Sequence, residues 1–375
     1  MFIKLILFLF LFIYTIANTE NNNDFYAKIN QIKNYFFEYG SLDIPAYLIE
    51  NNHKKNLLVI GRAMDTKMGE IVILKRLSDN GSGQIILPLK DGGFHLKWIV
   101  PDAYKKAITY VKQSKIPQAI TLIRPHIYPL IQYLDINNEV FDIQHPILFF
   151  LKILIENEQW EEAFFILSKI SYKKVNPIYQ NFLFKVSEQF ITLRQPTLAI
   201  QLFEKVFTQN ANLQLQDKMM DFLYLLMLNG YPKKSSYLYD KIIKIHDFHF
   251  IIECRLWQAY CHLKMKQPEL TRMSIDKLGK IPSNKKEFSL YLFILSQLDT
   301  LEEHFEDAIT KLSRAIIYAP KDSRWVPELM YTTGYVYQEL GNIEASNSIH
   351  KKVTLFFPKS FWAIKSHQII SEKIP

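Results

Sequence analysis

Apolar positions along residues 102–361 recur at the spacing of amphipathic helices, and the helices come in pairs. A small residue recurs early in the second helix of each pair, at Ala119, Ala163, Ala199, Ser235, Thr271, Ala308 and Ser346. Successive intervals are 44, 36, 36, 36, 37 and 38 residues. One helix pair cannot bury its apolar face alone, so such units stack on their neighbours. The pattern predicts an α-solenoid of about seven helix pairs.

The last two pairs carry the clearest motif residues. FEDAITKLSRAIIYAP ends at Pro320, and GNIEASNSIHKKVTLFFP ends at Pro358. In the final unit Gly334 lies where two helices must approach closely, and Gly341 closes the turn. Over residues 284–361 this pattern resembles the tetratricopeptide repeat family, in the form seen in bacterial envelope proteins. The resemblance is moderate over residues 177–210 and weak elsewhere.

The resemblance implies a concave surface lined by the first helix of each pair, where a protein or peptide binds. Aromatic side chains mixed with polar ones suit such recognition, because a few anchors carry most of the binding energy. The predicted groove residues are Asn181, Phe184, Glu188, Phe293, Gln297, Glu328, Tyr331, Tyr335 and Gln338. The alternative is that these rings pack into neighbouring repeats. Trp362, after the closing proline, is expected to seal the end of the stack within a capping helix and tail, residues 362–375.

The pattern of apolar and polar residues is different in the segment before the helices. Residues 18–37 contain a polar tract and a short amphipathic helix, and residues 38–101 read as a small β-rich module. Its apolar runs NLLVIGRAM, GEIVILKRL, GQIILPLK and GFHLKWIV are separated by the turn-forming clusters DTKMG, SDNGSG and KDGG. This pattern predicts three or four strands joined by hairpins in an antiparallel sheet. Asp102 is predicted to cap the first helix that follows.

The N-terminus has the layout of a secretory signal. Lys4 precedes an apolar run over residues 5–16, and small residues and a polar tract follow it. We therefore expect residues 1–17 to be a signal peptide, and the mature chain to be exported to the periplasm or envelope. The run is short for a membrane span, and no second long run occurs. An uncleaved N-terminal anchor is the alternative.

Charge and cysteine content narrow the function classes. The net charge is +8, but the lysine pairs are scattered along the chain, so we predict no nucleic-acid partner. Cys254 and Cys261 are seven residues apart. On one helix they would be about 10 Å apart along the axis, too far for a disulfide. We expect both thiols to be free and buried.

Candidate chemistry is sparse. The Gly81–Ser82–Gly83 loop lacks the following Gly-Lys-Ser/Thr of a phosphate-binding loop, so a hairpin turn is the better interpretation. His246 and His249 lack further metal ligands nearby. The sequence predicts no catalytic residue, no metal site and no cofactor.

These observations favour a non-catalytic exported scaffold that binds a protein or peptide in the solenoid groove, with a cell-envelope component as a candidate partner. The main alternative is a binder of cell-wall polymer or glycan, in which the β module grips the polymer and the solenoid is a spacer. An enzyme with a site in the β module is a third, weaker hypothesis.

Overall fold

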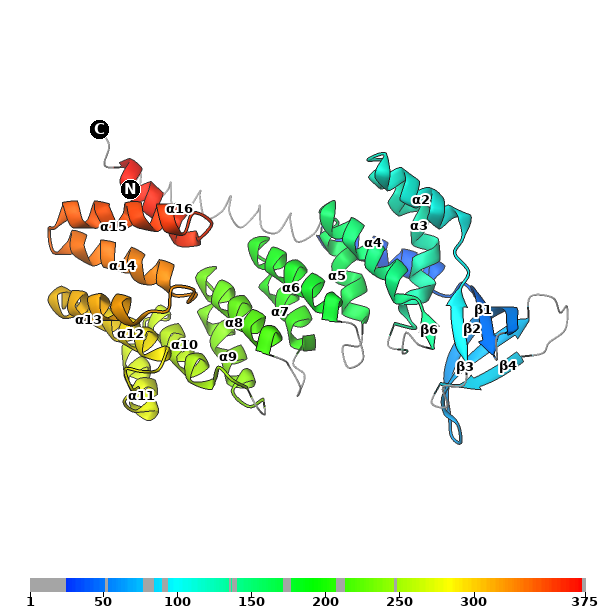
Figure 1. Ribbon diagram of the computed structural model, residues 1–375, viewed down its shortest axis with the longest axis horizontal. Helices are drawn as coiled ribbons and strands as arrows, with labels where there is room; N and C mark the ends of the chain where they lie inside the picture. The colour runs from blue at the N-terminus through cyan, green and yellow to red at the C-terminus, as the bar shows by residue number, and fades with distance from the viewer. Residues whose placement is uncertain are drawn as a thin grey trace, which may run out of the picture. The chain divides into compact units, whose positions relative to one another are not determined.

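The computed structural model describes residues 25–50, 53–76, 84–89, 94–134, 136, 140–170, 177–206, 213–245 and 248–372. The predicted signal peptide, the Gly81–Ser82–Gly83 loop and His246 lie outside these residues. The chain divides into two compact units, Met1–Val206 and Phe207–Pro375. The fold is mainly α-helical, with one small N-terminal sheet, as the sequence predicts (Figure 1).

The described helices form seven successive pairs. Three pairs belong to the first unit: α2 (Asp102–Lys112) with α3 (Ile116–Ile131), α4 (Gln144–Glu156) with α5 (Trp160–Lys169), and α6 (Pro177–Thr192) with α7 (Pro196–Phe203). Four belong to the second unit: α8 (Leu213–Leu228) with α9 (Pro232–Ile242), α10 (Ile251–Lys264) with α11 (Pro268–Leu278), α12 (Glu287–Leu301) with α13 (Phe305–Tyr318), and α14 (Val326–Glu339) with α15 (Ile343–Phe356). A last helix, α16 (Phe361–Glu372), packs on α15 and α14.

All seven pairs use the same turn. One residue in each turn adopts a positive φ, and these residues are Ser114, Glu158, Arg194, Gly230, Lys266, Glu303 and Gly341. The N–H of the following residue donates to a carbonyl one turn back in the first helix, as Gln267 N–H does to the His262 oxygen at 3.0 Å. This is the Schellman arrangement that satisfies the last carbonyls of a helix. The left-handed residue lies five positions before the small residue of every pair, so turn and packing share one period.

The small residues of the second helices are the closest packing points, as predicted. All seven have no exposed surface. Ser235 Oγ and Thr271 Oγ donate to the carbonyl oxygens of Leu223 and Ala259 in their partner helices, at 2.8 and 3.2 Å. At these two positions, a short polar side chain substitutes for alanine because it bonds across the pair while adding little volume.

Gly334 confirms the expected close approach in the last pair. A Cβ atom at this position would lie 2.8 Å from His350 Nε2 of α15. His350 is fully buried, and its Nδ1 lies 3.1 Å from Ser366 Oγ of α16. The absent side chain of Gly334 therefore gives the imidazole the space to connect α14, α15 and α16.

The sheet has six described strands, whereas the sequence predicts three or four. They are β1 (Ile44–Glu50), β2 (His53–Asp65), β3 (Gly69–Arg76), β4 (Gln84–Pro88), β5 (His95–Trp98) and β6 (Phe141–Asp142). Their order is β4-β3-β2-β1-β5-β6. Neighbours pair antiparallel, except that β5 and β6 pair parallel. Alternate side chains of β1 are buried, so the sheet has one apolar face.

The extra strands have physical explanations. In β1, Ile44, Ala46 and Leu48 alternate inward, but Pro45 argues against a central strand. The proline is tolerated because it lies at the beginning of the strand, and its carbonyl still accepts from Ile99 N–H at 2.9 Å. Strand β6 is two residues long and lies between helix pairs, where no alternation can be seen.

Asp102 does not cap α2, so that prediction is wrong by one position. Pro101 occupies the N-cap, with extended backbone and no side-chain hydrogen bond. Asp102 is in the first turn, where its carboxylate accepts from Lys105 Nζ at 2.9 Å. That contact lowers the pKa of Asp102 below its ordinary value. A carboxylate there still complements the positive end of the helix dipole.

A helix over residues 25–39 belongs to the helical part of the first unit. Phe25 packs edge-on against Phe190 at 5.6 Å between ring centroids, and Phe36 packs against Phe165 at 5.4 Å. The Arg124 guanidinium of α3 lies 4.5 Å from the ring centre of Tyr35. This helix therefore contacts one helix from each of three successive pairs.

Within the described residues, every helix is too short or too polar to cross a membrane.

Candidate functional site

The predicted groove residues of the first unit fall on one helix with different exposures. Asn181 and Glu188 of α6 are exposed, but Phe184 between them is buried. The Phe184 ring packs edge-on against Phe203 at 6.1 Å between centroids. Phe184 therefore fills the contact with its partner segment and has no surface to offer a peptide.

In the second unit, two predicted groove residues are core residues. Phe293 of α12 is fully buried against the Tyr260 ring at 5.6 Å. Glu328 of α14 is 1% exposed. Its carboxylate accepts hydrogen bonds from Tyr224 OH of α8 at 2.9 Å and Tyr260 OH of α10 at 2.7 Å. Lys264 Nζ lies 3.3 Å from the same carboxylate.

This network closes the inner face of the second unit. Burial, followed by the charge of Glu328, raises the pKa of Tyr224 and Tyr260 well above the ordinary tyrosine value. Both phenols therefore stay protonated and donate. A buried carboxylate needs such partners, because an uncompensated charge in the interior is very unfavourable. The network connects α8, α10 and α14 and leaves no opening at Glu328.

A second charged cluster reinforces this closure. Arg324, in the segment between α13 and α14, contacts three carboxylates: Asp217 at 2.6 Å, Glu253 at 3.0 Å, and Asp221. Burial raises the pKa of Asp221, although the nearby guanidinium opposes this. The guanidinium is well suited to several carboxylates at once because its donors are fixed in a plane.

Trp362 of α16 is buried against the residues of this network. Its Nε1 donates to Tyr224 OH at 3.2 Å, and its ring lies 4.8 Å from that of Tyr331. Tyr331 is thereby half-buried. Gln297 is also half-buried and donates to Thr332 Oγ1 at 3.0 Å. Of the predicted residues in this unit, Tyr335 is the most accessible at 38% exposed, and Gln338 is half-buried.

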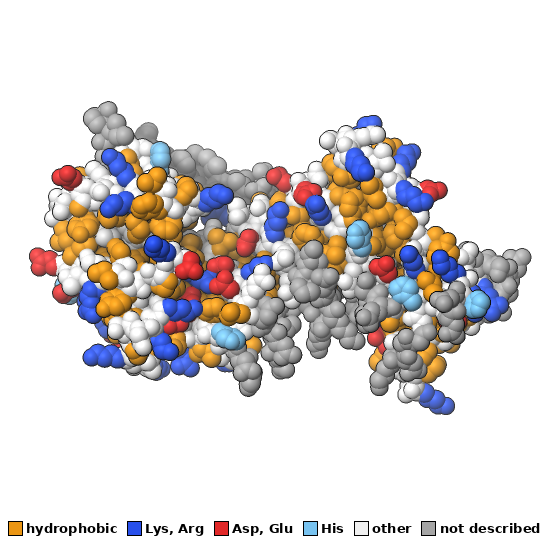
Figure 2. Space-filling model, viewed as in Figure 1, with side chains coloured by type: hydrophobic (Ala, Val, Ile, Leu, Met, Phe, Trp, Pro, Cys, Tyr) orange, Lys and Arg blue, Asp and Glu red, His pale blue; other side chains and the backbone are white. Residues whose placement is uncertain are grey.

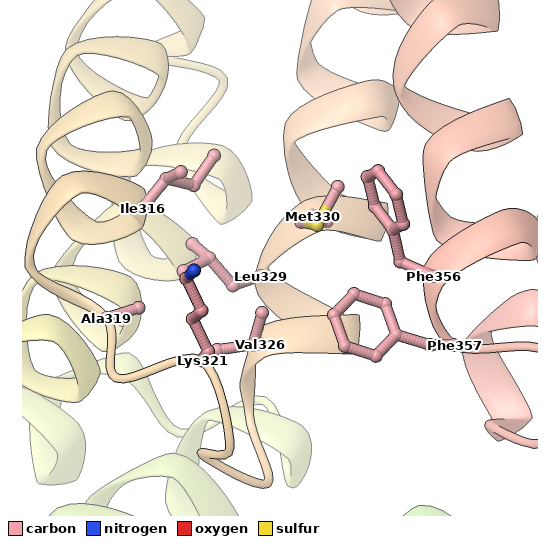
Figure 3. Close-up of a pocket in the computed structure, with 8 residues that line it drawn as sticks. All are labelled: Ile316, Ala319, Lys321, Val326, Leu329, Met330, Phe356 and Phe357. Carbon is pink, nitrogen blue, oxygen red and sulfur yellow. The ribbon is translucent and has the colours of Figure 1, made fainter.

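The outer side of α14 carries an open apolar pocket of about 460 Å³. Its floor is formed by Val326, Leu329 and Met330 of α14 (Figure 3). The two sides come from the ends of α13 and α15, as Figure 3 shows, and the full lining is Ile316, Ala319, Lys321, Val326, Leu329, Met330, Phe356 and Phe357. We call the pocket and its exposed borders the outer groove.

Large apolar side chains are exposed at the outer groove and at positions next in the sequence to its lining residues. On α13, Ile317 is 77% exposed; on α15, Leu355 and Phe356 are 72% and 61% exposed. Figure 2 shows hydrophobic side chains gathered over the α13–α16 part of the second unit, with Lys and Arg among them. Scattered apolar residues on a surface are ordinary, but a contiguous group bordering a concave pocket is characteristic of an interaction site.

Sequence reasoning missed the outer groove, although a signal was present. The run TLFFP puts adjacent apolar residues at 355, 356 and 357, and one helix face cannot bury all three. The run AIIYAP at the end of α13 also has more adjacent apolar residues than one helix face can bury. Two such excesses, one repeat apart, indicate an outward apolar surface.

No group of three or more His, Cys, Asp or Glu side chains in the described ranges is placed to hold a metal ion. His249 donates its backbone N–H to Gln216 Oε1 at 2.8 Å. Glu161 and Glu162 lie in the first turn of α5, and Glu162 is buried in an ion pair with Arg124 at 2.8 Å.

The repeat geometry decides the fold type. Seven helix pairs share one left-handed turn position and one fully buried small residue, at intervals of 36 to 38 residues after the first. By fold, this is a tetratricopeptide-type repeat protein.

Comparisons with solved structures give tetratricopeptide-type proteins. MamA from Desulfovibrio magneticus RS-1 is 14% identical with a TM-score of 0.29, covering 48% of this chain and 96% of MamA. The type IV pilus biogenesis factor PilW is 15% identical with a TM-score of 0.31, covering 69% of this chain and 94% of PilW. A tetratricopeptide repeat protein from Parabacteroides merdae is 15% identical with a TM-score of 0.29, covering 62% and 97%.

All three TM-scores are low, so the fold type of this chain is identified by its own repeats. No family model matches the sequence, and no curated protein is similar to it.

Proposed function

We propose that this protein is a non-catalytic scaffold that binds a segment of another protein. The observation that supports the proposal is the outer groove, an apolar pocket lined in part by the exposed Phe356. Exposed Ile317 and Leu355 lie next in the sequence to its lining residues Ile316 and Phe356. Exposed apolar surface costs about 25 cal/mol per Å² relative to burial, so covering this surface is a driving force for association. Aromatic side chains such as Phe356 are typical binding anchors.

A second contact surface is proposed on the opposite side of α14. There, Tyr335 and Gln338 keep some exposure beside the closed inner network. Tyr335 has the largest exposed fraction among the sequence-predicted groove residues of the second unit. The two surfaces lie on opposite faces of one helix, so separate variants can test them.

Export of the protein is part of the proposal. The N-terminal layout of a charged residue, an apolar run and a small-residue cleavage context supports a signal peptide over residues 1–17. The scaffold would then act in the periplasm or envelope. N-terminal sequencing of the protein recovered from fractionated cells tests this: a mature chain beginning near residue 18 is expected, and an intact Met1 in the membrane fraction would contradict cleavage.

Site-specific photo-crosslinking tests the scaffold function. A photoreactive amino acid is placed at Leu355 in the outer groove, at Tyr335 on the inner side, and at Met273 of α11 as an exposed control. The crosslinked products are identified by mass spectrometry. We expect a discrete heterologous product from position 355 that is lost when Phe356→Ser is added. Equal products from 355 and 273 would contradict the proposal.

A further inference from the structure

We propose that the outer groove receives an acidic amphipathic helix of the partner protein. This inference rests on the proposed function and names the chemistry of the segment bound there. Three observations carry it: the arrangement of the helices that form the groove, the absence of acid in its lining, and lysines at its borders that pair with no described carboxylate.

The helix arrangement suits a fourth helix. Both α13 and α15 pack on α14, so the side of α14 between them forms a trough. Packed helices lie about 8–10 Å apart, and a further helix can place its apolar ridge in such a trough. The pocket of about 460 Å³ in the floor can take one or two large apolar side chains. Recognition of this kind uses apolar anchors at i, i+3, i+4 and i+7.

The lysines at the outer groove favour acidic side chains on the polar face of the bound helix. Lys321 lines the pocket, and its ammonium reaches back beside Leu329 (Figure 3). Lys352 lies four residues before Phe356 and so shares its face of α15, and Lys359 follows the helix. None of these three lysines makes an ion pair with a described residue. All eight lining residues are described, and none is acidic.

Lysine near a helix C-terminus also complements the helix dipole, and Lys321 and Lys352 both lie near such ends. That role stabilises the fold but gives no preference among ligands. The two roles are therefore separated by measuring which charge a bound peptide carries.

Apolar residues with lysines also occur on proteins that bind anionic membranes. Membrane insertion uses protruding side chains, whereas here the apolar surface continues into a pocket whose floor is formed by Leu329 and Met330. The concavity favours a ligand that inserts side chains into the protein. Binding to vesicles is measured as the competing outcome.

The first experiment selects ligands without assuming a sequence. A library of helix-forming peptides of 16 residues, with random side chains, is displayed on phage and selected on the full-length protein without its first 17 residues. We expect enrichment of peptides with Leu, Ile, Phe or Met at helical spacing and with excess Asp and Glu. Neutral or basic enriched peptides, or no enrichment at all, would overturn the inference.

The second experiment measures the charge preference. An enriched peptide is labelled with fluorescein, and its Kd is measured by anisotropy against a copy in which Glu and Asp are replaced by Lys and Arg. The double variant Lys321→Glu, Lys352→Glu should weaken the acidic peptide about tenfold, since reversing each rim charge replaces attraction with repulsion. The matched control Lys277→Glu, Lys218→Glu changes net charge equally on other helices and should leave Kd unchanged.

The outcomes separate the inference from the proposed function. If peptides bind through Phe356 but show no charge preference, the groove binds protein and the inference is wrong. If binding ignores Phe356→Ser, the outer groove is not the site, and both fail. Sedimentation with vesicles of phosphatidylglycerol and phosphatidylethanolamine, lost in Phe356→Ser, would assign the surface to a membrane instead. A dimer in light scattering that Phe356→Ser dissociates would assign it to a second copy of the chain.

Discussion

The carboxylate of Glu328 lies 2.9 Å from the hydroxyl of Tyr224, a residue 104 positions earlier in the sequence. The first helix of one pair thus bonds to the first helix of a pair three repeats before it. The inner positions that meet this network are therefore interior positions, and this explains why Phe293 and Glu328 are buried. Phe293 and Glu328 therefore have no surface to offer a partner.

Replacing Glu328 should destabilise the second unit strongly. Glu328→Ala removes the acceptor of Tyr224, Tyr260 and Lys264, and we expect a loss of about 3 kcal/mol or more in the free energy of unfolding. Tyr224→Phe removes one hydrogen bond and should cost about 1–2 kcal/mol. The measurement is urea unfolding of the full chain with hydrogen exchange of α14. Glu339→Ala, exposed on the same helix, is the control, and an equal loss there would contradict the role of Glu328.

The shared turn predicts opposite effects for two kinds of substitution. Lys266 and Glu303 adopt φ of 58° and 63°, where a side chain is strained by about 1 kcal/mol. Lys266→Gly and Glu303→Gly should therefore stabilise the second unit by up to about 1 kcal/mol, and Gly341→Ala should destabilise it by a similar amount. Thermal unfolding of the three variants decides the matter. If both glycine substitutions destabilise the protein, the contacts of the Lys266 and Glu303 side chains stabilise these turns by more than the backbone strain costs.

Much of the helical fold could be predicted because each pair has the same packing requirements at the same positions. The small residues at 119 to 346 carry the period, since only a small side chain fits where two helices cross. The turn was harder to read, because five of seven left-handed positions hold residues other than glycine. Lys266 and Arg194 give no local sign of a positive φ; the stacked helices on either side impose it.

The site could be predicted only in part. Helical spacing places Glu328, Tyr331, Tyr335 and Gln338 on one stripe of α14. Spacing cannot reveal that α8 and α16 approach that stripe. Contacts between residues as distant as Trp362 and Tyr224 depend on the curvature of the stack, which is set by the sum of all its packing angles. The parallel pairing of β6 could not be predicted because a strand of two residues shows no alternation of apolar and polar side chains.

Gly334→Ala tests the close approach between α14 and α15. The new Cβ would lie 2.8 Å from His350 Nε2, so the imidazole must move and its contact with Ser366 must break. We expect a loss of about 1–3 kcal/mol from overpacking, although alanine is otherwise the better helix former. Gly334→Ala combined with His350→Ala should recover part of that loss. A stabilising effect of the single variant would show that the helices are not in contact there.

Cys254 and Cys261 lie on α10, the first helix of its pair, and both are buried in the core of the second unit. Burial raises the pKa of Cys261 to about 12 and that of Cys254 well above its ordinary value. At pH 8 both groups are therefore thiols, which react poorly with alkylating reagents. The native protein should resist iodoacetamide at pH 8, and both positions should be labelled in urea, as counted by mass spectrometry. Rapid labelling of the native chain would mean that α10 opens readily.

Substitutions of two phenylalanines, one in the core and one on the surface, should have different effects on stability. Phe293 is fully buried and Phe356 is 61% exposed. Phe293→Ser should cost about 4 kcal/mol or more, because it leaves a cavity and buries a hydroxyl. Phe356→Ser should change the free energy of unfolding by no more than about 0.5 kcal/mol, since little packing is lost. Phe356→Ser should nevertheless abolish binding of a selected peptide. If it instead unfolds the second unit, Phe356 is a packing residue, and the outer groove loses its main anchor.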